Sequence, residues 1–134
     1  MEDTKKTHIK GLVGELEFSL RLLEKGWNVY RPIDPNSRAD LVVEKDGNYK
    51  KIQVKYCTPR EGCLQIELVR PMRKTKPYSL EEVDDVGVFD PITKKCYLIS
   101  LREILPRKRI WLRVDETHNG CNDKHINWAE KYLI

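Results

Sequence analysis

The chain has 134 residues, and we expect residues 1–134 to form a single domain. Hydrophobic residues make up 40% and charged residues 34%, which excludes a disordered chain and predicts a soluble, globular protein. No apolar run approaches the roughly 18–20 residues that span a bilayer, and the start lacks the apolar stretch of a signal peptide. We therefore expect no membrane partner and a cytoplasmic location, and a net charge of +4 identifies no partner by itself.

The first predicted element is an amphipathic helix over residues 7–25. Apolar residues recur there at three- and four-residue steps, which predicts that one stripe faces the core: Leu12, Val13, Leu16, Leu20 and Leu23. Gly11 and Gly14 are unusual inside a helix, where each costs about 1 kcal/mol relative to alanine. Placed three apart, they would leave a smooth surface beside Glu15 that DNA or a sheet can approach closely.

Short strands separated by turn residues follow this helix. We expect strands at residues 27–31, 39–45, 49–57, 63–69, 86–90, 96–101 and 110–114, and a short helix at 127–134. The basic stretch at residues 71–77, which prolines flank, is expected to be an exposed loop. A helix followed by a mainly antiparallel sheet predicts an α+β or mixed α/β fold with flanking helices.

An Asp-Gly turn at residues 46–47 sets the register of the hairpin formed by the second and third strands. In this register Asp40 directly faces Gln53, and side chains opposed in this way lie about 5 Å apart on one face. Lys55 lies two residues beyond Gln53 and shares that face. A slip of one residue would send Asp40 to the other side of the hairpin.

The other face of the same hairpin is predicted to be apolar, with Leu41 opposite Ile52 and Ala39 opposite Val54. Two interpretations of the polar face stay open at this point. Polar alternation on an exposed hairpin explains the pattern without any chemistry. Alternatively, the acid, the amide and the amine form a catalytic site, and the types of residue indicate which reaction it would serve.

Hydrolysis of a phosphodiester needs charge stabilisation on the phosphoryl oxygens, an activated water and a stabilised leaving oxygen, and a hard divalent cation can serve all three. Mg²⁺ prefers one or two carboxylates together with waters and a substrate phosphate. We expect Asp40, the amide oxygen of Gln53 and the backbone carbonyl of Val54 to be its ligands. The Lys55 ammonium would contact the phosphate or orient the water. Glu15 would add a second carboxylate from the helix.

Glu17 competes with Glu15 for this role, but it points about 200° around the helix from Glu15. Positive charge is concentrated in two other stretches, one at residues 102–113 and one comprising Arg70, Arg73, Lys74 and Lys76. Such clusters suit phosphate contacts, although a solvated basic loop is the alternative. Residues 70–76 would also read bases, since arginine to guanine is the commonest specific contact. Arg38 either contacts a phosphate or pairs with a carboxylate.

Three segments together resemble the PD-(D/E)xK nuclease superfamily: Gly11-Leu-Val-Gly-Glu15-Leu-Glu-Phe, Arg38-Ala-Asp40-Leu-Val-Val and Ile52-Gln53-Val-Lys55. The likeness is greatest to the intron-associated homing endonuclease branch, which carries Gln where most relatives carry Glu. The resemblance implies a restriction-endonuclease-like core and cleavage of double-stranded DNA that depends on Mg²⁺, with Mn²⁺ as a substitute. It also implies that Glu15, Asp40, Gln53 and Lys55 are catalytic.

Three hypotheses about function stay open. The first is a site-specific DNA endonuclease, and the second is a structure-selective nuclease such as a Holliday-junction resolvase or a repair nuclease. The third is a DNA-binding module with a decayed site, because the neutral Gln53 lowers the ligand charge by one. A symmetric double-strand cut by one active site per chain requires at least two chains, so we expect a homodimer or homotetramer.

Overall fold

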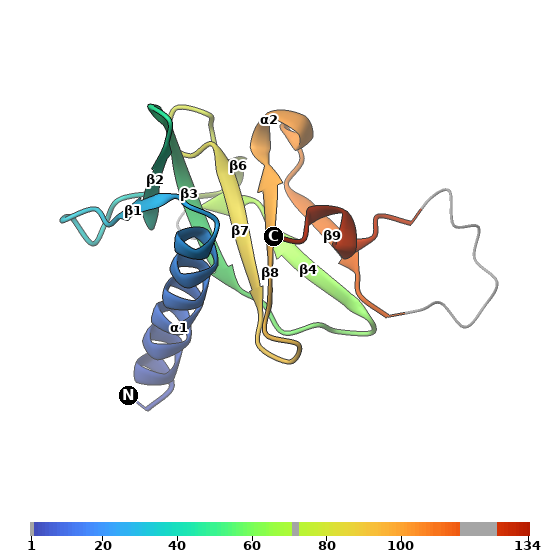
Figure 1. The fold of residues 1–134 in the computed structure, drawn as a ribbon. Coiled ribbons are helices and arrows are strands. Elements are labelled where there is room, and N and C mark those ends of the chain that lie inside the picture. The colour runs from blue at the N-terminus through green and yellow to red at the C-terminus, as the bar shows by residue number, and fades with distance from the viewer. Residues whose placement is uncertain (1, 71–72, 116–125) are drawn as a thin grey trace.

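The structure is a computed structural model that describes residues 2–70, 73–115 and 126–134. For residues 2–5, 70 and 73–77 it describes the backbone alone. A long helix comes first and is followed by short strands (Figure 1). The elements are α1 (Glu2–Glu24), β1 (Asn28–Tyr30), β2 (Leu41–Lys45), β3 (Asn48–Tyr56), β4 (Cys63–Glu67), β5 (Val69–Arg70), β6 (Arg73–Pro77), β7 (Asp85–Asp90), β8 (Lys95–Ser100), α2 (Leu101–Ile104), β9 (Arg109–Arg113) and the 3-10 helix η2 (Ala129–Tyr132). Among the described residues, no helix has the length and apolar character needed to cross a bilayer.

A five-stranded mixed sheet with the order β1-β2-β3-β7-β8 forms the centre of the fold. Its neighbours are antiparallel except for β3 and β7, which run parallel. The strands β4 and β9 form a second, two-stranded sheet, and β5 pairs with β6 in a third. This arrangement confirms the predicted mixed α/β class, in which one helix precedes a mainly antiparallel sheet.

The central sheet is covered on both faces. Between α1 and the sheet lies one core cluster, built from Phe18, Leu22, Leu41, Val43, Ile52, Val54, Phe89 and Cys96. Residues from β4, β9 and the segment before β7 form the second cluster with Val86 and Val88 of β7 on the other face. Strand β2 pairs with residues 48–52 of β3 and β7 pairs with residues 52–56, so the half of β3 that carries the predicted site residues is held by the central strand β7.

The buried face of α1 differs from the predicted one. Phe18 and Leu22 are almost fully buried, whereas Leu16, Leu20 and Leu23 are 54%, 48% and 55% exposed. The helix therefore carries two apolar stripes, and periodicity alone does not tell which of them meets the sheet. The stripe that contains Phe18 is the one that meets the sheet, because the Phe18 ring packs over Gly87 so closely that a Cβ there would lie 2.6 Å from the ring.

Two further expectations need correction. Residues 73–77, expected to be in an exposed loop, form strand β6, because Val69 pairs with Pro77 and Arg70 with Arg73 in a short antiparallel hairpin. The short helix α2, at residues 101–104, was not predicted, because four residues are too few to show a helical period. The terminal helix expected at residues 127–134 is present as the shorter 3-10 helix η2.

Candidate active site

The hairpin of β2 and β3 has the register that the Asp-Gly turn predicts. Lys45 pairs with Asn48, and the ladder continues regularly to Leu41 opposite Ile52. Asp46 and Gly47 both have positive φ angles, 53° and 81°, as the favoured two-residue hairpin turn requires. The confirmed register fixes where β2 ends relative to β3, and so determines the position of the residue just before β2.

Asp40 lies where the chain leaves this ladder. Its backbone N–H donates to the carbonyl of Ile52 at 2.9 Å, and its Oδ2 accepts the N–H of Val54, also at 2.9 Å. The carboxylate thus takes the place of a backbone acceptor beside β3. Ala39 was expected to face Val54 on the apolar side of the hairpin, and this expectation was wrong. Ala39 packs in the second core cluster, whereas Val54 packs in the cluster between α1 and the sheet.

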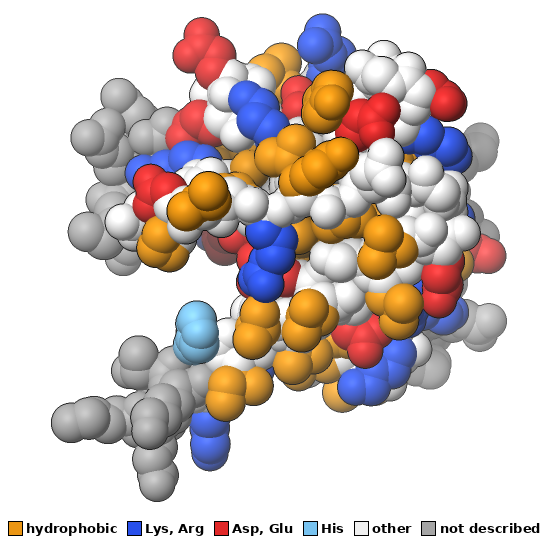
Figure 2. Space-filling view, turned by 60° about the vertical axis from the view of Figure 1, so that its left-hand side comes forward, with side chains coloured by type: hydrophobic (Ala, Val, Ile, Leu, Met, Phe, Trp, Pro, Cys, Tyr) orange, Lys and Arg blue, Asp and Glu red, His pale blue; other side chains and the backbone are white. Residues whose placement is uncertain are grey.

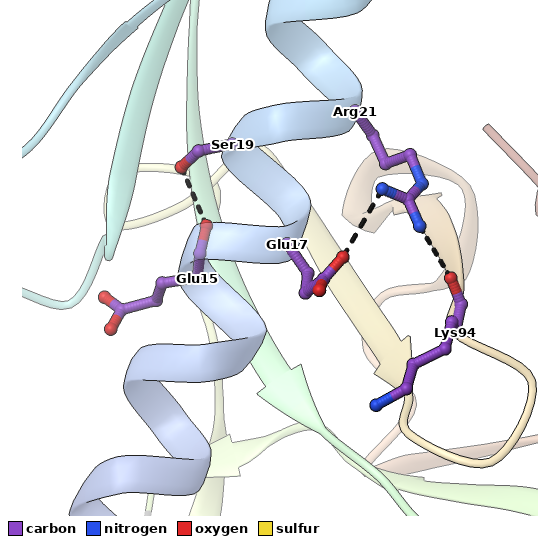
Figure 3. Close-up of polar contacts among 5 residues, drawn as sticks. All are labelled: Glu15, Glu17, Ser19, Arg21 and Lys94. Carbon is purple, nitrogen blue, oxygen red and sulfur yellow. Dashed lines mark hydrogen bonds and ion pairs between the residues drawn. The ribbon is translucent and has the colours of Figure 1, made fainter.

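Glu15 lines the same pocket as Asp40, a pocket of about 450 Å³ between α1 and the loop at residues 31–40. Figure 3 shows that Glu15 projects to one side of α1, while Glu17 and Arg21 project to the other side. Glu17 forms an ion pair with Arg21 at 3.4 Å there. Of the two helix carboxylates, only Glu15 lines the pocket that Asp40 lines.

Burial raises the pKa of Asp40 to about 6 from a usual value of 3.8. The Val54 N–H lowers this pKa, the Glu15 carboxylate raises it, and the cations of Lys55 and Arg31 lower it. Desolvation and a neighbouring acid both disfavour the charged carboxylate, and a bound cation would reverse this balance. Two carboxylates that act on each other in one pocket, one of them with a strongly raised pKa, mark a candidate functional site.

Lys55 and Gln53 line a separate pocket of about 360 Å³. Val54, whose N–H binds the Asp40 carboxylate, also lines that pocket. Burial lowers the pKa of Lys55, while the carboxylates of Asp40 and Glu67 raise it. The ammonium stands over the ring of Tyr78, with Nζ 5.4 Å from the ring centroid. The structure thus brings Glu15 and Asp40 together in one pocket and Gln53 and Lys55 together in the next.

The donor set fits a hard cation of the Mg²⁺ type. In residues 2–70, 73–115 and 126–134, no three His, Cys, Asp or Glu side chains are grouped as metal ligands. A structural Zn²⁺ site would need four such ligands and a catalytic Zn²⁺ site three. Mg²⁺ instead takes one or two carboxylates and fills its remaining positions with waters and substrate oxygens. Glu15 and Asp40 could supply these two carboxylates, and amide or carbonyl oxygens from β3 could complete the protein share.

Sequence reasoning missed two residues of the carboxylate pocket. Arg31 places Nη2 3.5 Å from Oε2 of Glu15, and it is 51% exposed while Glu15 is 19% exposed. His8 lines the same pocket from the helix, two turns before Glu15. The helical spacing from His8 to Glu15 was a signal that could have been used. No sequence spacing relates Arg31 to the helix, because strand pairing brings β1 to this position.

The residues predicted to contact DNA are distributed differently. Nε of Arg38 lies 3.4 Å from Oε2 of Glu82, so Arg38 pairs with a carboxylate, which was one of its two predicted roles. The other four, Arg70, Arg73, Lys74 and Lys76, lie on β5 and β6. Their side chains lie outside the described residues, so their predicted DNA contacts stay predictions.

Comparison with known proteins identifies the family. A family model described as PD-(D/E)XK endonuclease matches residues 5–134. The chain belongs to the PD-(D/E)XK endonuclease family. The predicted family is thereby confirmed.

This endonuclease is also similar to solved structures and to a curated protein. The bacterial homing endonuclease I-Ssp6803I is 20% identical with a TM-score of 0.72, over 95% of this chain and 88% of that one. That similarity shows the shared fold. Protein 5.3 of Escherichia phage T7 is 39% identical over 51 residues, which is 38% of this chain and 43% of that protein. The chain therefore matches less than half of the length of that relative.

Proposed function

We propose that this PD-(D/E)XK endonuclease cuts double-stranded DNA at specific sites by hydrolysing phosphodiester bonds with the help of a divalent cation, Mg²⁺ or in its place Mn²⁺. The observation that carries the proposal is the pairing of Glu15 and Asp40, whose carboxylates come from separate elements and line one pocket, where burial first and then the Glu15 charge raise the pKa of Asp40. Such a pair suits a cation that binds phosphate. The proposal includes residues 1–134 as one nuclease domain.

Each site residue has a role in this proposal that follows from its chemistry. Asp40 and Glu15 hold the cation, and the amide oxygen of Gln53 and the backbone carbonyl of Val54 complete the protein ligands. The cation supplies charge stabilisation for the phosphoryl group and lowers the pKa of a water. Lys55, a compact ammonium in a partly desolvated position, orients the attacking water or contacts the phosphate.

The DNA duplex needs further contacts outside the catalytic pocket. We assign phosphate contacts to Arg70, Arg73, Lys74 and Lys76 on the β5–β6 hairpin, with Arg38 able to exchange Glu82 for a phosphate. Each phosphate contact releases bound counterions, so the affinity for DNA should fall steeply with salt. Substitution of one of these basic residues should reduce the slope of that dependence by about one.

The decisive experiment compares cleavage of supercoiled plasmid in Mg²⁺ and in EDTA, for the wild type and for Asp40→Asn. We expect nicked and linear products only from the wild type with Mg²⁺. Equal background cutting in all reactions, with DNA still bound, would favour the third hypothesis, a decayed DNA-binding module, for which the neutral Gln53 is the supporting observation. Glu17→Gln is the matched control, because it removes a helix carboxylate outside the pocket.

The choice of substrate separates the two enzyme hypotheses. A library of random linear duplexes and a set of four-way junctions would be incubated with the same protein. Recurrent cut positions in the duplex library would support site-specific cleavage, whereas cutting of junctions alone would support a structure-selective nuclease. Site-specific double-strand cleavage by one site per chain also requires a homodimer or homotetramer with two-fold symmetry.

A further inference from the structure

Helix α1 carries an exposed apolar stripe on the side opposite the sheet. Ile9, Leu16, Leu20 and Leu23, which we call the outer stripe, are 57%, 54%, 48% and 55% exposed. At 100° per residue these four side chains fall within a sector of about 60°, and the buried Phe18 lies on the opposite side of the helix. Figure 2 shows hydrophobic side chains gathered on this exposed face.

The spacing of the outer stripe distinguishes it from scattered surface residues. Single exposed apolar residues are common in soluble proteins and need no explanation, whereas contiguous patches mark interaction sites. Ile9, Leu16 and Leu23 are each seven residues apart, with Leu20 between the last two. A seven-residue repeat of apolar residues is the pattern of a helix that packs against another helix.

We propose that the outer stripe packs against α1 of a second copy of this chain in an antiparallel pair, with the two-fold axis passing beside Leu16. In this arrangement Leu16 meets Leu16 of the second copy, and Ile9 meets Leu23 of the second copy at both ends. The stripe is therefore complementary to itself, as a two-fold interface requires. The proposal rests on the proposed function, since a double-strand cut needs two active sites.

Charges beside the stripe favour the antiparallel direction. Lys6 and Glu24 project from the same flank of α1, since 18 residues bring the helix through five whole turns. In the antiparallel pair Lys6 lies level with Gly26 of the second copy, two positions from Glu24, so opposite charges meet at each end. In a parallel two-fold pair this flank would face opposite ways on the two helices, and Lys6 would lie five turns from Glu24 of the second copy, so these opposite charges would not meet.

The same symmetry places both active sites on one face of the pair. Glu15 is next to Leu16 and projects sideways from the stripe, so the two Glu15 side chains lie near the axis and on the same flank. With helix axes 8–10 Å apart, the two carboxylates would be on the order of 15 Å apart. That separation is comparable to the roughly 12 Å major groove, so both strands of one duplex come within reach. A parallel pair would turn the two sites to opposite faces.

Cross-linking tests the position of the axis directly. Leu16→Cys should form a disulfide with itself across the pair under mild oxidation, whereas Leu23→Cys should not, because it faces Ile9 of the second copy. The wild type provides the background from the native cysteines. Cross-linking of Leu23→Cys in place of Leu16→Cys, or of neither above background, would overturn the antiparallel pair.

Sedimentation equilibrium tests the stripe and its flanking charges. Leu16→Lys should raise the dissociation constant of the pair by about tenfold or more, because two ammonium groups would meet at the axis. Ile92→Lys, a matched change at a 71% exposed residue in the turn between β7 and β8, should leave it unchanged. Lys6→Glu should weaken the pair and the double variant Lys6→Glu/Glu24→Lys should restore it. A monomeric wild type, or equal effects of Leu16→Lys and Ile92→Lys, would overturn the interface.

Plasmid products separate failure of the interface from failure of the proposed function. Leu16→Lys should still nick plasmid DNA with Mg²⁺ but should give several-fold less linear product than the wild type. A wild type that cuts both strands while Leu16→Lys forms linear product equally well would overturn the interface and leave the nuclease proposal standing. A dimeric wild type with Leu16→Cys cross-links but no cleavage would overturn the function and retain the interface.

Discussion

Replacing Asp40 with asparagine should stabilise the protein while abolishing cleavage. Asp40 is held beside β3 by the N–H of Val54, and its pKa is raised to about 6 chiefly by burial and further by Glu15. Asparagine keeps an oxygen that can accept the Val54 N–H, but it carries no charge to bury. The substitution therefore removes an electrostatic cost of folding together with a cation ligand, a trade that is common at active sites.

The size and pH range of the stabilisation follow from the same shift. From 3.8 to about 6, the pKa of Asp40 rises by about two units, which at 1.36 kcal/mol per unit gives about 3 kcal/mol as an upper limit. Partial exposure of the carboxylate screens this value to about 1–2 kcal/mol. Because the folded pKa lies above the unfolded one, the wild type loses stability as the pH rises from about 4 to about 6. The advantage of Asp40→Asn grows over that range and is constant above it.

Urea denaturation in EDTA at several pH values from 4 to 8 would measure this difference. Adding Mg²⁺ should then stabilise the wild type and leave Asp40→Asn unchanged, since a ligand that binds the folded state raises its stability. Glu17→Gln is the control for loss of a carboxylate from the same region, and it should show no gain at pH 8. Equal or lower stability of Asp40→Asn at pH 8 in EDTA would refute the reasoning.

Four further predictions concern packing and charge. Gly87→Ala should lower the free energy of unfolding by about 1–3 kcal/mol, because its Cβ would lie 2.6 Å from the ring of Phe18. Gly11→Ala should raise the free energy of unfolding by up to about 1 kcal/mol, because a Cβ at Gly11 would meet nothing within 4 Å. Arg31→Gln should leave the affinity for Mn²⁺, measured by titration calorimetry without DNA, equal or up to about threefold higher, because a cation competing for Glu15 is removed; weaker binding would show that Arg31 holds Glu15 in place. Gln53→Glu should raise the same affinity by about tenfold, and an unchanged affinity would place Gln53 outside the cation site.

The hairpin that carries Asp40 could be predicted because its turn is specified locally. Asp46 and Gly47 adopt the positive φ angles that the two-residue turn needs, and the register of the whole β2–β3 ladder follows from that turn. The register placed Leu41 against Ile52 correctly. Strand order, by contrast, is not local, and the parallel pairing of β3 with β7 could not be predicted from either strand's sequence.

The parts that could not be predicted depend on contacts between distant residues. Helix α1 has two apolar stripes of similar strength, and the choice between them depends on how Phe18 fits over Gly87, which is 69 positions away in the chain. Ala39 was misplaced because the side chain of Asp40 replaces a backbone acceptor and ends the regular alternation. Arg31 reaches Glu15 only because β1 pairs with β2, and no local pattern encodes that pairing.

Two protein cations compete with a divalent cation for the carboxylates of the pocket. Arg31 pairs with Glu15, and the charges of Lys55 and Arg31 both act on Asp40. A divalent cation bound alone would add two positive charges beside Arg31 and Lys55, which is unfavourable in a partly desolvated site. A DNA phosphate supplies negative charge at the same place, and the neutral Gln53 does not. We therefore expect Mn²⁺ and DNA to bind cooperatively, with Mn²⁺ affinity about tenfold higher in the presence of an uncleavable duplex. Equal Mn²⁺ affinity with and without the duplex would contradict this electrostatic competition.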